Sequence, residues 1–394
     1  MTETAPASAP DVLRRWRLLL GEPAAAALGV ELSSAEVGMD RALAALYDPD
    51  TDGESRSRSG GLGSSAPQVA RWLGDIRSYF PTSVVQVMQR DAVERLQLAS
   101  MLLEPELLDS VQPDIHLVST LVGLNKAMPE TTKATARHVV GQVVAQVERR
   151  LATRTRAAVS GALNRASRAS RPRPADIDWN ATIGRNLRHY LPELGTVVPV
   201  RLVGYGRSAP TLARDVVVAI DQSGSMAESL VYAAVFGATL ASIRAVRTSL
   251  IAFDTEIADL TDKLHDPVEV LFGCQLGGGT DINRAIAYCQ QLITRPNETV
   301  LILISDLYEA GIAHEMLRRI AELLRAGVTV VALLALSDSG APSYDHEHAA
   351  ALAELGVPAF ACTPDQFPDL LAVAVGRGDI ASWVSQTAAA AAST

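Results

Sequence analysis

The chain has 394 residues, of which 48% are hydrophobic and 20% charged, and its formal net charge is −9. A chain of this length has room for two domains, and its composition is that of a globular protein with substantial cores. The acidic balance argues against a general affinity for nucleic acids, because a phosphate backbone repels an acidic surface.

Cysteine usage and the N-terminal sequence indicate the compartment in which the protein works. Its three cysteines, Cys274, Cys289 and Cys362, show no CxxC pairing and are too few for a disulfide framework, so we expect buried thiols in a reducing compartment. Residues 1–10 lack the basic and apolar segments of a signal peptide. The longest uncharged apolar run, residues 230–243, is shorter than the roughly 20 residues that span a bilayer. We therefore expect a cytoplasmic protein with no membrane partner.

The N-terminal half of the chain has a helical pattern in two parts. Residues 1–47 are predicted to form a helical segment whose second helix begins at Ser33, where Glu36 completes a capping box. Residues 48–66 are rich in Gly, Ser and charge, which predicts a flexible linker. Residues 67–205 are predicted to form an α-helical domain of several short helices, because Leu and Val recur there at three- and four-residue spacing.

A basic stretch, residues 149–173, stands out in this acidic chain because it contains no acidic residue. Its arginines are Arg149, Arg150, Arg154, Arg156, Arg165, Arg168, Arg171 and Arg173. We interpret it as a solvated helix and linker whose charge meets an acidic partner surface. An RNA-binding arm is the alternative, although the stretch lacks the aromatic residues on which bases would stack.

Residues 206–378 alternate between apolar strand patterns and helical patterns, and residues 379–394 are expected to be a C-terminal tail. The predicted strands are 216–220, 248–253, 299–304, 328–336 and 358–362, and the predicted helices are 226–245, 281–294, 312–326 and 345–355. Continuous apolar runs are typical of strands buried on both faces of a parallel sheet. The alternation therefore predicts an α/β fold with an open, doubly wound, mostly parallel sheet, whose site lies at the carboxyl ends of the strands.

The loop after the first predicted strand reads Asp221-Gln222-Ser223-Gly224-Ser225. Alternate side chains of an extended chain point the same way, so Asp221, Ser223 and Ser225 can converge on one point. One carboxylate and two hydroxyls form a hard oxygen set that suits Mg2+ or Mn2+. Gly224 would let the backbone turn tightly before the helix. The alternative interpretation is that a serine hydroxyl caps the following helix.

A second loop, Gly277-Gly278-Gly279-Thr280-Asp281, directly precedes a predicted helix. Its glycines allow close backbone approach to a ligand and a positive φ. We expect Thr280 to add a hydroxyl to the metal site, and Asp281 to cap the helix.

The third loop, Ser305-Asp306, ends the strand at 299–304, where Asp306 would complete the oxygen set directly or through a water. Glu309 is expected to support the site or to face a partner. Asp254, after the second strand, is expected to be either a supporting residue or an ordinary exposed acid. A weaker candidate metal cluster, residues 345–348, lies at a predicted helix start.

Together these loops resemble a metal-ion-dependent adhesion site, the signature of von Willebrand factor A (VWA) domains. The motif match covers about residues 211–375. The resemblance implies that a divalent cation, Mg2+ or Mn2+, is bound by Asp221, Ser223, Ser225, Thr280 and Asp306. It also implies an open coordination position that a Glu or Asp of a partner protein fills. The glycine that usually follows the third-loop aspartate is Leu307 here.

The whole chain resembles a narrower group, the bacterial CoxE-like VWA proteins that are associated with MoxR-type AAA+ ATPases. The segments that carry this resemblance are IDQSGSM, LGGGTDI, ISDLYE and, at 176–190, DIDWNATIGRNLRHY. The resemblance implies a non-enzymatic adaptor that binds a protein partner through its metal. It implies that a MoxR-type ATPase then remodels the client or inserts a metal cofactor into it.

Two other functions remain open on sequence alone. Ro-like proteins also pair helices with a VWA domain, so the helical domain and the basic stretch are an alternative RNA site, although the overall charge makes nucleic acid the less favoured partner. Hydrolysis at the metal is a further alternative. No nucleophile-elbow motif or Ser-His-Asp pattern in the sequence supports it.

Overall fold

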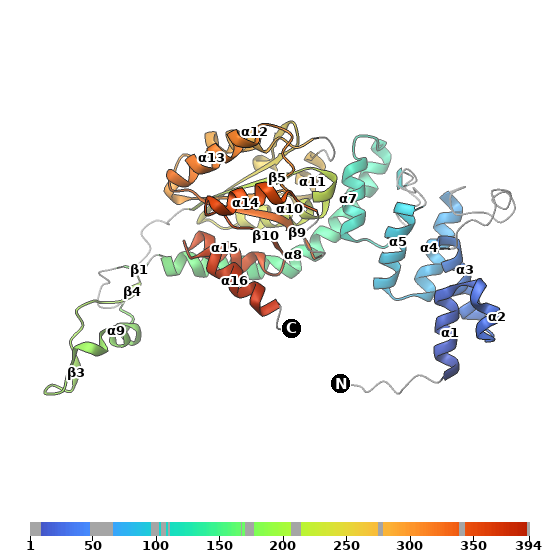
Figure 1. Ribbon diagram of the computed structural model, residues 1–394, viewed down its shortest axis with the longest axis horizontal. Helices are drawn as coiled ribbons and strands as arrows, with labels where there is room; N and C mark the ends of the chain where they lie inside the picture. Colours follow the sequence, from blue (N-terminus) through green and yellow to red (C-terminus); the bar gives the residue numbers. More distant parts are fainter. Residues whose placement is uncertain are drawn as a thin grey trace. The chain divides into compact units, whose positions relative to one another are not determined.

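The chain divides into two compact units, Met1–Val143 and Val144–Thr394, which we describe separately (Figure 1). The computed structural model describes residues 9–47, 66–95, 102–103, 108, 111–166, 168–169, 177–205, 214–274, 279–338 and 343–391. The predicted linker lies outside these residues, apart from Ala66, which begins a helix. The two units meet inside a single long helix, whereas the sequence placed the domain boundary after residue 205.

The described part of the first unit is helical, as the sequence predicted. Its helices are α1 (Ala9–Leu20), η1 (Glu22–Ala24), α2 (Ala25–Leu28), α3 (Ser34–Tyr47), α4 (Ala66–Tyr79), α5 (Thr82–Arg95), α7 (Ile115–Leu124) and the start of α8 (Glu130–Ala166). Side chains at helical spacing, such as Trp72 and Ile76 of α4 and Val85 and Met88 of α5, are buried. The capping box before α3 is confirmed, because the Ser33 amide donates to Glu36 Oε2 at 2.8 Å and the Glu36 amide donates to Ser33 Oγ at 3.3 Å.

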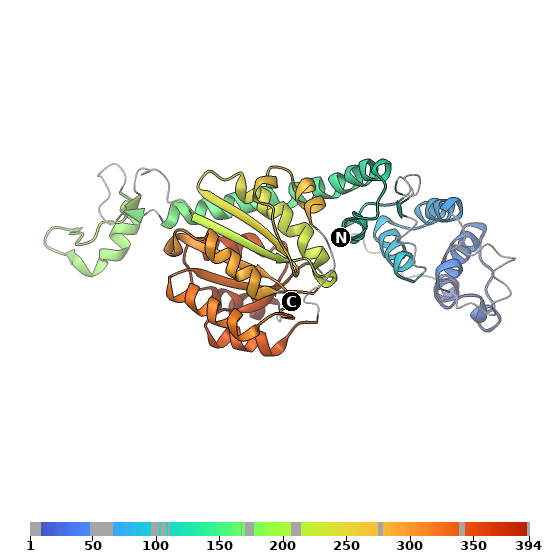
Figure 2. The same cartoon turned by 90° about the horizontal axis from the view of Figure 1, so that it is seen from above.

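The second unit is built around a six-stranded sheet with the order β10-β9-β8-β5-β6-β7 (Figure 2). The strands are β5 (Arg214–Asp221), β6 (Val246–Phe253), β7 (Ile257–Asp259), β8 (Thr299–Ile304), β9 (Thr329–Leu336) and β10 (Ala359–Cys362). Only β7, which forms a hairpin with β6, is antiparallel to its neighbour. Both β5 and β8 are buried along their whole length, which explains their continuous apolar sequences. All five predicted strands are confirmed.

Helices cover both faces of this sheet. One face packs against α12 (Ile282–Leu292), α13 (Ala313–Arg325) and α14 (His346–Glu354), and the other against α10 (Ala227–Ala241), with α11 (Pro267–Gly273), α15 (Phe367–Val375) and α16 (Ile380–Ala391) on that side. The rings of Phe236 in α10 and Phe367 in α15 lie 4.5 Å apart. The sequence analysis did not identify α11 or α15, and it expected a tail where α16 forms.

Helix α10 and the cysteines are part of the apolar interior. The segment Gly224–Ala241 has the length and mean hydropathy (1.2) of a membrane span, but 67% of it is buried inside the fold, where α10 lies against the sheet and α11. Cys274, Cys289 and Cys362 are buried and unpaired, as expected, and burial raises the pKa of each thiol to about 12.

The second half of α8 lies against the sheet-containing unit to which it belongs. Leu151, Thr155 and Val159 recur every four residues and are buried, so they form one face of the helix. On the solvent side, Arg150 Nε donates to Asp365 at 3.2 Å, and Arg154 Nη2 is 2.7 Å from an Asp369 carboxylate oxygen in α15.

These ion pairs change the interpretation of the basic stretch. The acidic surface that Arg150 and Arg154 meet belongs to the same chain, and Arg156 likewise donates to Ser242 at 3.2 Å. Arg171 and Arg173 lie outside the described residues.

Replacing Arg150 with alanine is expected to lower the free energy of unfolding by less than about 1 kcal/mol, because exposed ion pairs are weak and screened by salt. About half of each side chain in the Arg150–Asp365 pair is exposed. Urea unfolding at low and at 0.5 M salt measures this effect, and the difference between wild type and variant should shrink as salt rises. A loss of several kcal/mol that does not depend on salt would contradict this view of how α8 is held.

Residues 177–205 form a small module in which Thr182 and Asn186 are buried beside Val203, while most of the apolar side chains are exposed. Its elements are α9 (Trp179–Asn186), η6 (Leu187–His189), β2 (Tyr190–Leu191) and β3 (Thr196–Val197), while β4 (Gly204–Tyr205) pairs with β1 (Arg168–Ala169). Asn186 is buried, donates to the carbonyls of Thr182 and Arg201, and accepts from the amide of Val200. These bonds satisfy the backbone of a segment too short to have an apolar core.

Candidate metal centre

The site lies at the carboxyl ends of β5 and β8, the two central strands of the sheet. Parallel pairing places Ile220 opposite Ile304, so the next residues, Asp221 and Ser305, leave the sheet side by side. Ser305 Oγ donates to Asp221 Oδ2 at 2.9 Å, and both side chains are buried. The sequence analysis named Ser305 only as the neighbour of Asp306, because its contact with Asp221 depends on strand order.

The first loop brings its two serines to the acids. The amide of Ser223 donates to Asp221 Oδ1 at 2.8 Å, which turns the chain directly after β5. Ser223 Oγ and Ser225 Oγ lie 3.1 Å apart, and Ser225 Oγ donates to Asp306 Oδ2 at 2.6 Å. Neither serine hydroxyl caps η7 (Gly224–Met226) or α10, so the helix-capping alternative is wrong.

The second loop contributes Thr280 from the other side of Asp221. Thr280 is buried, and its Oγ1 donates to Asp221 Oδ1 at 3.3 Å. Asp281 caps α12 by accepting from the Arg284 amide at 2.8 Å, as expected. Hydrogen bonds of 3.3 Å or less thus link all five predicted metal-ligand residues, Asp221, Ser223, Ser225, Thr280 and Asp306, and the bond between Ser223 and Asp221 comes from the Ser223 backbone amide.

The third loop turns at Leu307, which takes a left-handed backbone conformation with φ at 65°. A non-glycine residue there costs about 1–2 kcal/mol. The Leu307 side chain is fully buried in the apolar cluster beneath the site, and its amide donates to Ser305 Oγ at 3.0 Å. Burial of the leucine side chain offsets the backbone strain. The loop therefore has a left-handed turn at this position, although the residue is leucine and not glycine.

Glu309 ties the third loop to the second. Its carboxylate accepts from the amides of Ile282 at 2.6 Å and Gly311 at 2.8 Å, and half-burial raises its pKa. A Cβ at Gly311 would come closer than 3.0 Å to a carboxylate oxygen of Glu309 and to one of Asp281, so a side chain there would displace these carboxylates. Asp254 also supports the loops, because its carbonyl accepts from the Asp281 amide at 2.9 Å.

The glycines of the first two loops have a smaller role than the sequence suggested. Neither Gly224 nor Gly279 has a positive φ. A Cβ at Gly224 would meet nothing within 4 Å, and one at Gly279 would make ordinary contacts with Thr255 and Ala310 at 3.6 and 3.7 Å. Gly277 and Gly278 lie outside the described residues. Among the three described loop glycines, Gly224, Gly279 and Gly311, a Cβ would come closer than 3.0 Å to another atom only at Gly311.

Charge and burial determine whether a cation fits the site. Asp221 is fully buried and its pKa is raised, first by desolvation, with the neighbouring Asp306 carboxylate adding to the effect. No salt bridge joins either acid to a basic side chain within the described ranges. The negative charges of Asp221 and Asp306 are therefore not balanced by a basic side chain among the described residues. A hard divalent cation would supply the balancing positive charge.

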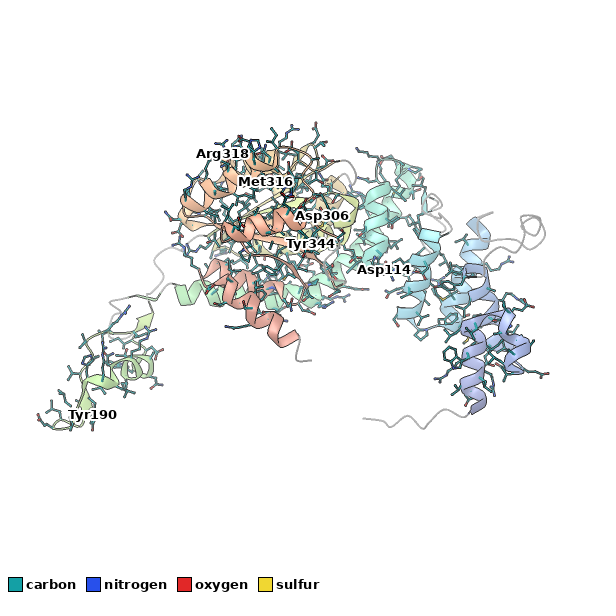
Figure 3. The ribbon with its side chains drawn as sticks, in the orientation of Figure 1. Asp114, Tyr190, Asp306, Met316, Arg318 and Tyr344 are labelled. Atoms are coloured by element: carbon teal, nitrogen blue, oxygen red, sulfur yellow. The ribbon has the colours of Figure 1, made fainter. Side chains whose placement is uncertain are left out.

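The donor set also limits which metal suits the site, in which Asp306 is the ligand labelled in Figure 3. Across the residues that the structure describes, no three His, Cys, Asp or Glu side chains form a cluster able to hold a metal ion. The weak candidate at residues 345–348 has a structural role instead: Asp345 caps α14, and His348 Nδ1 lies 3.0 Å from the Leu307 carbonyl. A cation at the strand ends would depend on hydroxyl oxygens beside its two carboxylates, which Mg2+ tolerates better than Zn2+ does.

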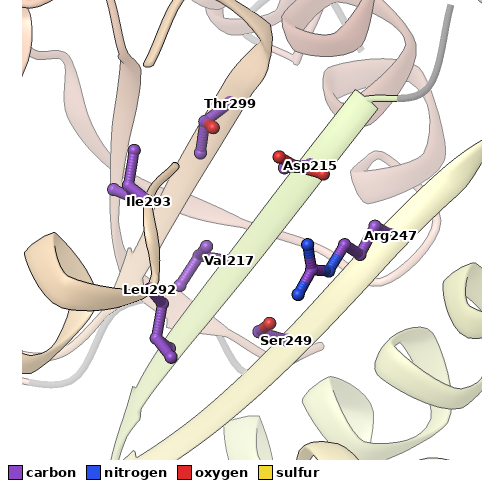
Figure 4. A pocket seen from close by; sticks show the side chains of 7 residues that line it. All are labelled: Asp215, Val217, Arg247, Ser249, Leu292, Ile293 and Thr299. Carbon is purple, nitrogen blue, oxygen red and sulfur yellow. The ribbon is translucent and has the colours of Figure 1, made fainter. Parts of the chain in front are cut away.

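The amino ends of the strands, opposite the candidate metal centre, carry a different set of side chains (Figure 4). A pocket there lies among the amino ends of β5, β6 and β8, and Asp215, Arg247 and Thr299 are among its lining residues. Asp215 is paired with Arg295, with Oδ1 and Nη2 2.5 Å apart. The one carboxylate in this pocket is therefore already neutralised, and this edge offers no oxygen set comparable to that of the carboxyl edge.

The doubly wound, mostly parallel sheet is the fold expected of a VWA domain, and the family match assigns the chain to that class. Residues 151–371 match the model of the family described as VWA domain containing CoxE-like protein, and the chain belongs to this family. The match begins in α8, in agreement with the packing of that half of the helix in the second unit.

Among known proteins, the chain is similar to the uncharacterized protein YehP of Escherichia coli (strain K12). The two are 35% identical over 381 residues, which is 95% of this chain and 96% of YehP.

Two solved structures also match, at lower similarity. BatB from Bacteroides thetaiotaomicron is 15% identical over 43% of this chain and 99% of its own, with a TM-score of 0.33. The Ro protein of Deinococcus radiodurans is 12% identical over 96% and 95% of the two chains, with a TM-score of 0.30. These scores are too low to support a statement about fold or function.

Proposed function

We propose that the chain is a non-catalytic adaptor that binds a partner protein through a divalent cation, Mg2+ or Mn2+, at the carboxyl edge of its sheet. Asp221, Ser223, Ser225, Thr280 and Asp306 would hold the cation. When bound, the cation would offer a coordination position to a carboxylate of the partner. Membership of the CoxE-like VWA family supports a binding role.

The observation that carries the proposal is the arrangement of oxygens around Asp221. A carboxylate with no solvent exposure is costly unless a positive charge or hydrogen bonds stabilise it. Asp221 receives hydrogen bonds from Ser223, Ser305 and Thr280, and its nearest acidic neighbour adds negative charge. Such an arrangement suits a bound cation better than it suits a cation-free core.

The remaining residues of the three loops hold the ligands in place. Ser305 orients Asp221, and Glu309 fixes the loop that follows Asp306 to the start of α12. Since binding sites lose affinity when their ligands are displaced by small distances, these contacts would set the affinity for the cation.

The proposed partner is a MoxR-type AAA+ ATPase or its client, and the proposed setting is the cytoplasm. This part rests on the resemblance to CoxE-like proteins, and the ATPase would use ATP hydrolysis to remodel the client or to insert a metal cofactor. The RNA-binding alternative has less support, because Arg150 and Arg154 of the basic stretch are paired with aspartates of the chain itself.

A comparative pull-down tests the proposal. Tagged wild type, Asp221→Ala and a control variant, Asp262→Ala, are incubated with native lysate in Mg2+ and in EDTA. Asp262 is an exposed aspartate near the end of the β6–β7 hairpin and makes no contact with the site loops. Partner proteins that elute only with wild type and Asp262→Ala in Mg2+ are expected. The same proteins, or RNA, in every condition would overturn the proposal.

A further inference from the structure

Exposed apolar side chains are rare on the sheet domain, and most of them lie beside the candidate metal centre. Between residues 214 and 391, the described large hydrophobic residues that are exposed are Tyr308 (47%), Ile312 (51%) and Leu355 (37%). Tyr308 and Ile312 belong to the loop that follows Asp306. Leu355 follows α14, shortly before β10 begins, and so lies toward the amino edge of the sheet.

The loop that carries Tyr308 and Ile312 is held firmly from within. Leu307 anchors it in the core, and Glu309 binds the amides of Ile282 and Gly311. The Ala310 amide donates to the Thr280 carbonyl at 2.8 Å, which adds a direct link to the second loop. These bonds fix the backbone on both sides of Tyr308. The conformation of the loop therefore holds the Tyr308 ring in its exposed position.

A neighbouring segment extends this surface. The Asp345 amide donates to the Asp306 carbonyl at 2.9 Å, which places the start of α14 next to the third loop. Tyr308 OH and Ser343 Oγ lie 2.7 Å apart, and the rings of Tyr344 and His346 are in tilted contact, with their centroids 4.3 Å apart. In Figure 3 the labelled Asp306 and Tyr344 lie close together on the same side of the sheet.

We propose that Tyr308 and Ile312 form an apolar rim beside the metal centre that contacts the partner protein. The rim would favour partner segments in which the acidic residue that binds the metal has an apolar residue close to it in sequence. This inference rests on the proposed function, because the acidic residue is useful only if the cation is bound. A carboxylate alone identifies many segments, whereas an apolar side chain at a fixed distance from it adds specificity through burial of its surface.

A peptide selection tests the rim directly. The probe is a displayed library of five-residue segments with glutamate fixed at the centre and the four flanking positions varied, selected on immobilised full-length protein in Mg2+ and in EDTA. Wild type is compared with Tyr308→Ser, Ile312→Ser and Tyr308→Phe. Leu355→Ser is the matched control, since it also removes an exposed apolar side chain but from a position remote from the site.

Wild type is expected to enrich, only in Mg2+, segments with Leu, Ile, Val or Phe at a flanking position. Tyr308→Ser and Ile312→Ser are each expected to weaken binding of the best segment about tenfold, a loss that corresponds to about 1.4 kcal/mol. Tyr308→Phe keeps the ring and should retain the preference, as should Leu355→Ser. All four variants should bind Mg2+ as wild type does, measured by titration calorimetry.

The outcomes separate the two proposals. Enrichment that requires Mg2+ but shows no apolar preference at the flanking positions would overturn the rim and leave the metal-dependent function standing. An apolar preference that survives both serine substitutions would also overturn it. If no segment is enriched in a Mg2+-dependent way, the proposed function itself fails, and the rim fails with it.

Discussion

Replacing Asp221 with asparagine is expected to abolish the stabilisation of the protein by Mg2+. A cation that binds only the folded state at about 100 times its Kd adds about 2.7 kcal/mol of stability. For a domain of this size, that corresponds to a rise in Tm of roughly 5–10 °C. Asp221 is the more deeply buried of the two carboxylates in the proposed ligand set, 0% exposed against 5% for Asp306, so its loss should remove most of the affinity. Thermal unfolding in Mg2+ and in EDTA measures the difference.

In EDTA we expect the opposite effect of the same variant, because without a cation the Asp221→Asn protein should be no less stable than wild type. Burial raises the pKa of Asp221 above its ordinary value of 3.8, so ionisation of this group is less favourable in the folded protein than in the unfolded chain. Its contribution to stability is therefore present below pH 3.8 and is lost as pH rises through the raised folded value. At neutral pH without a cation, Asp221→Asn should unfold at the same temperature as wild type or at a higher one.

Asp262→Ala serves as the control for Asp221→Asn and should keep the full response to Mg2+. If Asp221→Asn is still stabilised by Mg2+, Asp221 is not a ligand of the cation. A variant that is unstable in EDTA would show instead that the carboxylate has a structural role independent of metal.

Replacing Leu307 with alanine is expected to destabilise the protein by about 2–5 kcal/mol, which lowers Tm by roughly 5–15 °C. Leu307 is fully buried, and its side chain packs in the cluster formed by β5, β6, β8 and helices α12 to α14. The truncation leaves a cavity directly beneath the third loop. Denaturant unfolding in EDTA measures the loss without a contribution from bound cation.

Leu307→Gly separates the loss of side-chain packing at this position from the strain of its left-handed backbone. Glycine leaves a slightly larger cavity than alanine, but it removes the strain of about 1–2 kcal/mol that the left-handed conformation imposes on any residue with a Cβ. We expect Leu307→Gly to be as stable as Leu307→Ala or more stable, the reverse of their order in a helix or strand. If glycine is the less stable variant by about 1 kcal/mol, the backbone at Leu307 is not strained.

The apolar strands and the three site loops could be predicted because their signals are local. Buried strands such as β5 and β8 are runs of Val, Ile and Leu, and Gly327, whose φ of 95° suits glycine, follows the C-terminal end of α13. Asp221, Ser223 and Ser225 were expected to converge as alternate residues of an extended chain, but β5 ends at Asp221 and Ser225 lies in η7, so a turn and not a strand brings the serines to the acids. The family match and the sheet order agree with the predicted fold.

Features that depend on distant residues could not be predicted in the same way. The contact between Ser305 and Asp221 depends on β5 and β8 being neighbours, and the partners of Arg150 lie more than 180 residues away. Leu307 looked like a departure from the usual glycine, because the sequence does not show the pocket that receives its side chain. Helix α16 was taken for a tail because its sequence, rich in Ala and Ser, has a weak helical pattern of apolar residues.

Anomalous X-ray scattering from crystals grown with Mn2+ tests the central claim most directly. The account predicts one strong peak at the carboxyl ends of β5 and β8, about 2.0–2.3 Å from Ser223 Oγ and Ser225 Oγ, with Thr280 and the two aspartates around it. Crystals of Asp221→Asn should show no peak there. A protein with no anomalous peak at this edge, or with its only peak elsewhere, would contradict the assignment of a metal centre to these three loops.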